Sequence, residues 1–323
     1  MSLQFETASA CLKNVKRVKA SSGIIAYIVI AFIAGGCHLP RLNEFRDYQD
    51  NPEGYLTVWA LSDIQPKNAA QRYQFESAVS DTNGLRHAPH MAIVAGDIAH
   101  HRQSGPDFRW YIDAKKKSMI RHWFEIAGNH DMKDELNYRK LISSRLHYSV
   151  TVGNVLFLFM SDEDRFPAQK ISDSTFLWWK EKVEKNQDKI IVTVTHAYLQ
   201  ESRLIGSFIE SRNIAGSERF AEVLRKNRVD LWICGHTHIP SVIQGKWSIP
   251  AEFKNTLFLN VSSIRDDLFI GSESAFLILG KGTDRALIRY RNHTSGKFIL
   301  TMELRHSLSR NFEWDGSPPA MHY

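Results

Sequence analysis

Side chains that could bind a metal ion recur at five points along this sequence. Each point directly follows a run of apolar residues that predicts a buried β-strand. Carboxylate, amide and imidazole groups together suit Mn²⁺, Fe or Zn²⁺ better than Mg²⁺ or Ca²⁺, which prefer oxygen ligands alone. The five segments are Asp63-Ile64-Gln65, Gly96-Asp97, Gly128-Asn129-His130-Asp131, Thr195-His196 and Gly235-His236-Thr237-His238.

The strands that precede these segments must bring them to one place. Strands and helices alternate in the first half of the chain, which predicts βαβ units with parallel strands. In open α/β sheets, ligands bind beyond the carboxyl ends of the strands, so the five segments are expected to share one rim. The predicted strands are 55–62, 91–95, 122–127, 189–195 and 230–234, and the predicted helices between the first of them are about 68–81, 107–118 and 133–143.

The rest of the chain has a different pattern. Gly153-Asn154 predicts the two-residue turn of a hairpin between strands 148–152 and 155–160. Ser172 is expected to cap a helix, and a further helix is expected from Glu218 to Arg225. The last third is rich in strands and poor in helices, and residues 200–215 are expected to form a loop over the site. The strand-like runs are 256–261, 275–279, 286–291 and 297–304.

The ordered set Asp-x-Gln, Gly-Asp, Gly-Asn-His-Asp, His and Gly-His-x-His resembles the motifs of the calcineurin-like metallophosphoesterases. The resemblance runs from about Tyr55 to about Ile299. It implies an α/β fold, a four-layer α/β/β/α sandwich. It also implies an enzyme, a metal-dependent phosphoric ester hydrolase that cleaves phosphomonoester, phosphodiester or diphosphate bonds through a metal-bound hydroxide. Each motif alone is more often a turn or a strand end, but five in this order are not expected by chance.

The resemblance also implies a role for each residue. Two divalent metal ions, Mn, Fe or Zn, would be bridged by the Asp97 carboxylate. His130 would be the catalytic histidine, and Asp131 could orient it. The implied ligands of one ion are Asp63, Gln65, Asp97 and His238, and those of the other are Asp97, Asn129, His196 and His236.

Gln65 departs from the family pattern, because most members carry His at this position. Its amide oxygen is a neutral and weaker ligand, so the first ion is expected to bind less tightly or to require Mn²⁺ or Fe. We interpret the site as a variant. The alternative is a metal-binding scaffold or interaction protein of the same fold without turnover. Gln65 favours that alternative, and the presence of His130 counts against it.

The N-terminus carries a second signal. A basic cluster at 13–19 precedes the apolar run 24–34, which ends at Gly35-Gly36-Cys37. This pattern predicts a secretory signal and resembles a bacterial lipoprotein signal, with lipidation at Cys37. The alternative is an uncleaved N-terminal anchor. Either interpretation predicts an extracytoplasmic, membrane-anchored protein. The predicted divisions are 1–36 signal or anchor, 37–54 tether, 55–304 calcineurin-like phosphoesterase domain and 305–323 loose C-terminal tail.

Composition limits the partners. The 323 residues carry a formal net charge of +6, part of it in the basic cluster ahead of the apolar run. Because the remaining basic residues form no stripe interleaved with aromatic residues, we do not expect nucleic acid to be a partner, which disfavours a nuclease. The expected substrate is a phosphate ester, including lipid- or nucleotide-linked ones. Three cysteines exclude a disulfide framework, and Cys234 is expected to be a small buried residue.

Overall fold

A computed structural model describes residues 52–163 and 169–323. The predicted signal or anchor, most of the predicted tether and Cys37 lie outside these residues. Within the described ranges, no helix is both long enough and apolar enough to cross a membrane.

The first sheet contains the strands that end at the first three polar segments. Its order is β12-β11-β10-β1-β2-β3, and β13 pairs with β11. β1, β2 and β3 run parallel, and β10 is antiparallel to β1. The strands are β1 (Tyr55–Leu61), β2 (Met91–Ala95), β3 (His122–Ile126), β10 (Glu273–Gly280), β11 (Arg285–Asn292), β12 (Lys297–Phe298) and β13 (Leu304–Ser307).

The second sheet carries the other two segments. Its order is β14-β4-β5-β6-β7-β9-β8, with β5, β6, β7 and β9 parallel. The predicted hairpin is confirmed, because β4 and β5 pair across Gly153, whose φ is 55°. The strands are β4 (His147–Val152), β5 (Val155–Met160), β6 (Ile190–Val194), β7 (Leu231–Cys234), β8 (Trp247–Ser248), β9 (Leu257–Asn260) and β14 (Ala320–His322).

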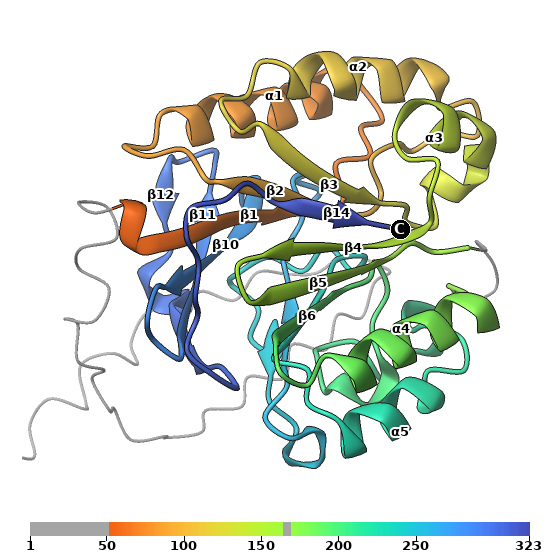
Figure 1. Ribbon diagram of the computed structural model, residues 1–323. Coiled ribbons are helices and arrows are strands. Elements are labelled where there is room, and N and C mark those ends of the chain that lie inside the picture. Colours follow the sequence, from red (N-terminus) through yellow and green to blue (C-terminus); the bar gives the residue numbers. More distant parts are fainter. Residues whose placement is uncertain (1–51, 164–168) are drawn as a thin grey trace, which may run out of the picture. The chain divides into compact units, whose positions relative to one another are not determined.

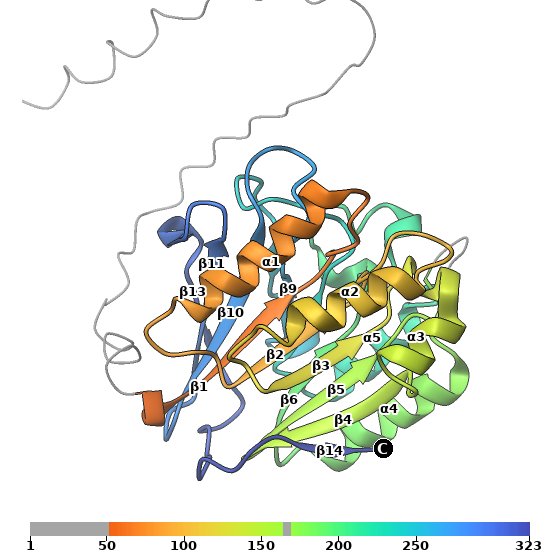
Figure 2. The same cartoon turned by 90° about the horizontal axis from the view of Figure 1, so that it is seen from above.

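Helices cover the outer face of each sheet. In Figure 1, α1 and α2 lie over the first sheet and α4 and α5 over the second, so the predicted four-layer order is confirmed. Figure 2 shows α1 and α2 lying side by side across the first sheet. The Asn68 and Ser172 side chains cap α1 and α4, accepting from the backbone N–H of Gln71 and Thr175. The helices are α1 (Ala69–Asn83), α2 (Gly105–Lys115), α3 (Glu135–Leu141), α4 (Asp173–Lys185) and α5 (Glu218–Lys226).

Burial on both faces of the sheets explains their continuous apolar runs. Along β1, Val58 belongs to the core between the two sheets, whereas the next residue, Trp59, belongs to the core under the helices of the first sheet. The alternation follows from the two-residue period of a strand. Cys234 is fully buried in the core under α4 and α5, as expected.

Two expectations for the C-terminal part are wrong. The run 297–304 is not one strand, because a 3₁₀ turn at Leu300–Met302 separates β12 from β13. The segment after Leu304 is not a loose tail. Phe312 is fully buried in the core between the sheets, and β14 pairs with β4. Pairing at a sheet edge depends on a distant strand, so the polar composition of 305–323 does not reveal it.

Candidate metal centre

The structure brings the seven predicted metal ligands together beyond the carboxyl ends of β1, β2, β3, β6 and β7. Their donor atoms form two overlapping groups. In each group, the ligand atoms of three residues lie within 4.8 Å of one another. The first group is Asp63, Asp97 and His238, and the second is Asp97, His196 and His236. Asp97 is common to both, which is the position predicted for a bridging carboxylate.

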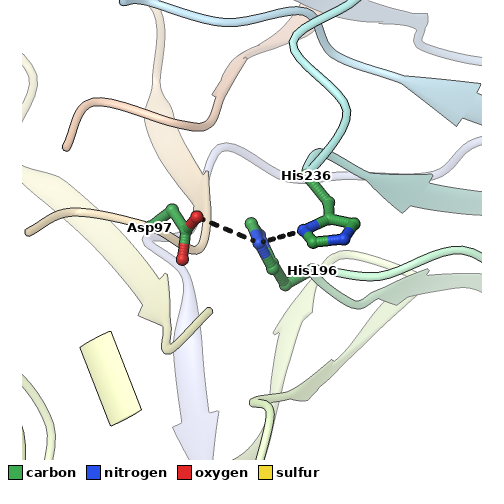
Figure 3. A group of neighbouring side chains, drawn as sticks. All are labelled: Asp97, His196 and His236. Carbon is green, nitrogen blue, oxygen red and sulfur yellow. Dashed lines mark hydrogen bonds and ion pairs between the residues drawn. The ribbon is translucent and has the colours of Figure 1, made fainter. Parts of the chain in front are cut away.

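His196 is the centre of the second group. Its Nδ1 lies 2.8 Å from the backbone oxygen of Ala95, which leaves Nε2 facing the other ligands. Nε2 is 3.2 Å from Asn129 Oδ1, 3.1 Å from His236 Nδ1 and 3.4 Å from Asp97 Oδ2. Figure 3 shows the His196 ring between the Asp97 carboxylate and the His236 ring. Atoms that all carry lone pairs therefore converge on one small volume.

Gln169 fixes the orientation of the His236 ring. When the Gln169 amide nitrogen donates to the backbone oxygens of Ser211 and Asn213, at 3.1 and 3.3 Å, its oxygen faces His236 Nε2 at 3.3 Å. His236 Nε2 then donates, and Nδ1 stays available to a metal. Sequence reasoning missed Gln169, because nothing in its local pattern relates it to a loop about 40 residues further along the chain.

In the first group, Asp63 Oδ1 and His238 Nε2 lie 3.0 Å apart. The contact lacks the alignment of a hydrogen bond, so this buried carboxylate oxygen has no hydrogen-bond partner. Gln65 lies beside the pair: its amide nitrogen is 2.8 Å from His238 Nε2, and its oxygen is 3.1 Å from His100 Nδ1. Metal binding requires the oxygen on the side of His238, which a half-turn of the amide provides.

His238 is supported from behind by Asp267. Its Nδ1 lies 2.8 Å from Asp267 Oδ2, which leaves Nε2 towards Asp63. Arg265 holds the same carboxylate through its Nε, 3.0 Å from each oxygen, and donates from Nη1 to the backbone oxygen of Gln65. A carboxylate behind a histidine ligand fixes the ring and raises its basicity. Neither residue is part of the sequence motifs.

The backbone at the site is strained. Four predicted ligands have positive φ: Asp63 (55°), Asp97 (56°), His236 (73°) and His238 (49°). For residues with a Cβ this conformation costs roughly 1–2 kcal/mol each. Such strain persists only where the surroundings impose it, and it concentrates at functional sites.

Close approach explains two of the motif glycines. A Cβ on Gly128 would lie 2.3 Å from Asp97 Oδ1. Gly96 has a φ of 88°, and a Cβ there would lie 2.6 Å from His196 Nδ1. Only glycine lets the three strand ends approach this closely.

Burial and mutual charge set the ionisation of the site. Burial raises the pKa of the Asp97 carboxyl, but the charge and contact of His196 hold that pKa well below its usual value. Burial lowers the pKa of His196, yet the Asp97 carboxylate raises it well above that of free imidazole. Burial and the charge of His196 lower the pKa of His236 to about 4. The Asp97 carboxylate is therefore ionised at neutral pH, the state in which a carboxylate can bind metal.

His130 lies at the edge of the site with its Nδ1 facing inward to the protein. Nδ1 is 2.6 Å from Lys133 Nζ and 3.2 Å from the backbone oxygen of His100. The two contacts correspond to different tautomers: Nδ1 accepts from the Lys133 ammonium when the ring proton is on Nε2, and donates to the His100 backbone oxygen when the proton is on Nδ1. The His100 ring stacks on the His130 ring with centroids 4.7 Å apart.

Asp131 has a different role from the expected one. Its carboxylate accepts hydrogen bonds from the backbone N–H groups of Ile98, Ala99 and Gly128, at 2.9–3.2 Å. It therefore ties the loop after β2 to the loop after β3 and does not orient the His130 ring. Burial and the charge of Asp97 raise the pKa of Asp131 to about 7.

Two further residues were not predicted at the site. His100, which lies outside the sequence motifs, contacts both Gln65 and His130. Asp162 is buried after β5, and neither carboxylate oxygen has a hydrogen-bond partner. Burial raises the pKa of Asp162 well above its usual value, and the charge of His196 opposes the shift. Asp162 follows an apolar strand like the other site residues, so the same pattern could have found it.

The site fits divalent cations. Two buried carboxylates, Asp63 and Asp97, face one another among imidazole and amide groups, an arrangement that a cation between them would stabilise. Residues Asp63, Gln65, Asp97 and His238 could hold one ion, and Asp97, Asn129, His196 and His236 the other.

Comparison with known families decides the relationship. Residues 56–240 match the calcineurin-like phosphoesterase family. The chain belongs to this family. The matched region contains every residue of both groups of candidate ligand atoms. None of the curated protein sequences matches the chain.

Two solved structures show the same fold. One is the purple acid phosphatase PPD1 from yellow lupin (Lupinus luteus) seeds, with 12% identity and a TM-score of 0.56 over 78% of this chain and 54% of that chain. This chain thus spans about half the length of that phosphatase. The other is GAP50, described as the anchor in the inner membrane complex of Plasmodium, with 14% identity and a TM-score of 0.55 over 81% of this chain and 91% of that chain.

Proposed function

We propose that this protein is a metal-dependent phosphoesterase that acts outside the cytoplasm at a membrane, to which its N-terminus is attached. It would use two divalent ions, Mn²⁺, Fe or Zn²⁺, to hydrolyse phosphomonoester, phosphodiester or diphosphate bonds of substrates that include lipid- or nucleotide-linked esters. The observation that carries the two-ion proposal is that Asp97 is shared by two groups of donor atoms. Membrane attachment is supported by the sequence, through the basic cluster, the apolar run 24–34 and Cys37.

When bound, two divalent ions polarise a phosphoryl group and make a water molecule more acidic. The protein's own residues position these events. Asp97 reaches both groups of ligands, and the backbone oxygen of Ala95 turns His196 so that Nε2 faces inward. In the tautomer in which His130 Nδ1 accepts from Lys133, Nε2 carries the ring proton and could pass it to the departing ester oxygen.

The experiment measures hydrolysis of p-nitrophenyl phosphate and bis-p-nitrophenyl phosphate by the full-length protein with Mn²⁺, Fe²⁺ or Zn²⁺. Turnover that Asp97→Asn abolishes supports the proposal, and the preferred ester distinguishes a monoesterase from a diesterase. Turnover that survives Asp97→Asn contradicts it. Bound metal without turnover of a broad ester panel, including a nucleoside diphosphate ester, would favour the scaffold alternative.

A further inference from the structure

Three loops around the metal centre expose apolar side chains to solvent. The first loop, residues 200–215, contains Ser211 and Asn213, whose backbone oxygens hold Gln169 beside His236. The second loop, residues 239–246, directly follows His238. The third loop, residues 266–271, contains Asp267, which contacts His238. We define the apolar rim as Phe208, Val242, Ile243, Leu268, Phe269 and Ile270. Phe269 is 97% exposed, Phe208 82% and Val242 68%. Single exposed apolar residues are ordinary, but several on neighbouring loops around a site indicate an interaction surface.

The loop at 266–271 is held in place while it exposes these side chains. The Asp266 carboxylate accepts hydrogen bonds from the backbone N–H groups of Leu268, Ile270 and Gly271, at 2.9–3.1 Å. Phe269 between them has a φ of 57°, a left-handed conformation that is unfavourable for an aromatic residue. The protein therefore maintains a strained loop whose tip is an exposed phenylalanine.

The three loops are connected to one another. Ser241, next to Val242, donates from its backbone N–H and its hydroxyl to the Glu273 carboxylate, which follows loop 266–271. The backbone N–H of Ile205 donates to the backbone oxygen of Gly245 at 2.8 Å. These hydrogen bonds join the three loops that carry the rim beside the metal centre.

The N-terminal sequence indicates what this surface meets. The apolar run 24–34 predicts attachment to a membrane, and the described chain begins at Pro52, before β1. The 15 residues 37–51 can span roughly 50 Å when extended. The extended tether is therefore longer than the seven-residue strand β1, whose length is roughly 23 Å. The tether joins the amino end of β1, and its length permits the carboxyl end of β1 to face the same bilayer.

We propose that the apolar rim inserts into the outer part of a lipid bilayer and holds the metal centre at the level of the lipid phosphates. This inference rests on the proposed function and narrows its substrate class to phosphate esters of membrane lipids. Side chains at loop tips enter the boundary between headgroups and acyl chains by about 5–10 Å. The phosphate groups of the bilayer lie at that boundary, whereas a soluble ester requires no such contact.

The first test compares two tryptophan variants of the full-length protein in phosphatidylcholine vesicles with and without brominated acyl chains. Phe269→Trp places the probe on the rim. Met119→Trp is the matched control, since Met119 is an exposed apolar residue before β3, at the opposite end of that strand from the site. Brominated lipid is expected to quench the Phe269→Trp signal at least about twofold more than the control signal, both relative to the wild-type protein. Equal quenching would overturn the proposal.

Two further measurements control for misfolding and for dimerisation. Leu268→Trp repeats the test should Phe269→Trp fail to fold, with the same expectation. The second measurement is the tryptophan fluorescence maximum of each rim variant without vesicles, together with the mass of the protein in solution. A blue-shifted maximum in a dimeric protein would show that a second copy covers the rim, which would overturn the proposal.

The second test uses a chemical reaction. The hydrolysis rate of phosphatidic acid in vesicles, divided by that of p-nitrophenyl phosphate, is expected to fall about tenfold in Phe269→Asp and to stay constant in Met119→Asp. An unchanged ratio in Phe269→Asp would overturn the inference. Absence of all ester hydrolysis would contradict the proposed function instead, while the quenching test would still decide whether the rim contacts lipid.

Discussion

Two clusters in this protein combine a carboxylate with histidine, and they differ in how their polar atoms are paired. In the first, Asp81 on α1 accepts two hydrogen bonds from Arg291 and one from His293, at 2.6–2.7 Å. His293 Nε2 in turn lies 2.7 Å from Ser274 Oγ. In the metal centre, Asp63 Oδ1 has no hydrogen-bond partner, although its carboxylate is fully buried.

The backbone differs in the same way. Asp81, Arg291 and His293 are outside the set of residues with positive φ, whereas Asp63 and Asp97 belong to it. A cluster whose donors and acceptors match stabilises the fold by itself. A cluster that buries several carboxylates close together on strained backbone reduces stability until a cation joins it. The comparison therefore separates a structural charge cluster from a functional one without reference to motifs.

The largest expected effect is on metal binding in Asp97→Asn. Because Asp97 is shared by both ligand groups, its amide should bind neither ion tightly, and turnover should fall by more than the ~10²–10³-fold typical of losing one electrostatic group. Isothermal calorimetry with Mn²⁺ measures the stoichiometry. Binding of two ions with unchanged affinity would show that Asp97 is not the bridge. Asp81→Asn is the control and should bind metal as the wild-type protein does.

His130→Ala should separate chemistry from binding. Without the proton donor, kcat is expected to fall by about 10²–10⁴-fold while metal affinity stays within a few-fold of wild type. Steady-state kinetics and calorimetry on the same preparation provide the two values. His101→Ala, which removes a mostly exposed histidine paired with Asp107, is the control. Parallel loss of metal and activity would instead make His130 a ligand.

Asp267→Asn should weaken the metal site without removing a ligand. The His238 ring loses the carboxylate that orients it, so affinity for one of the ions is expected to fall by about 10–100-fold. Calorimetric titration with metal measures the affinity for each ion. Asp113→Asn, on the exposed face of α2, serves as the control. Unchanged affinity for both ions would show that Asp267 only stabilises the loop.

Asp81→Asn should reduce the stability of the fold and leave activity unchanged. Removing the carboxylate leaves Arg291 and His293 largely buried without their partner, so the free energy of unfolding is expected to fall by about 1–3 kcal/mol. Urea denaturation measures the change. Ester hydrolysis should be unaffected, and a loss of activity at full stability would contradict the structural assignment of this cluster.

The acid dependence of stability should distinguish Asp81 as well. The hydrogen bonds from His293 and Arg291 overcome burial, which acts in the opposite direction, and lower the pKa of Asp81 from 3.8 to about 2. A lowered pKa in the folded state contributes stability that is complete above the unfolded value and is lost as pH falls through the folded value. Wild-type protein should therefore lose stability between about pH 4 and pH 2, and Asp81→Asn should lose less over that interval. If the free energy of unfolding fell equally between pH 4 and pH 2 in both proteins, protonation of Asp81 would not be linked to unfolding.

Sequence reasoning succeeded where the signal is local. Apolar runs of strand length followed by polar residues placed Asp63, Asp97, Asn129, His196 and His236 at strand ends, and their order carried the resemblance. It failed where a contact joins distant segments. Gln169 and Asp267 are recognisable only from the rings they face, and Phe312 only from the core it enters. Asp131 was interpreted from its place beside His130, but its carboxylate points to backbone donors on another loop.

The sequence by itself determined the alternation of strands and helices, the candidate ligands and the family, because hydrophobic periodicity and residue type act over a few positions. The tertiary structure decided which nitrogen of each histidine faces the site, which carboxylate lacks a partner, and that the apolar side chains of three loops form one rim beside the metal centre. These features depend on distances between residues far apart in the chain. Only the packing of the two sheets against each other sets such distances.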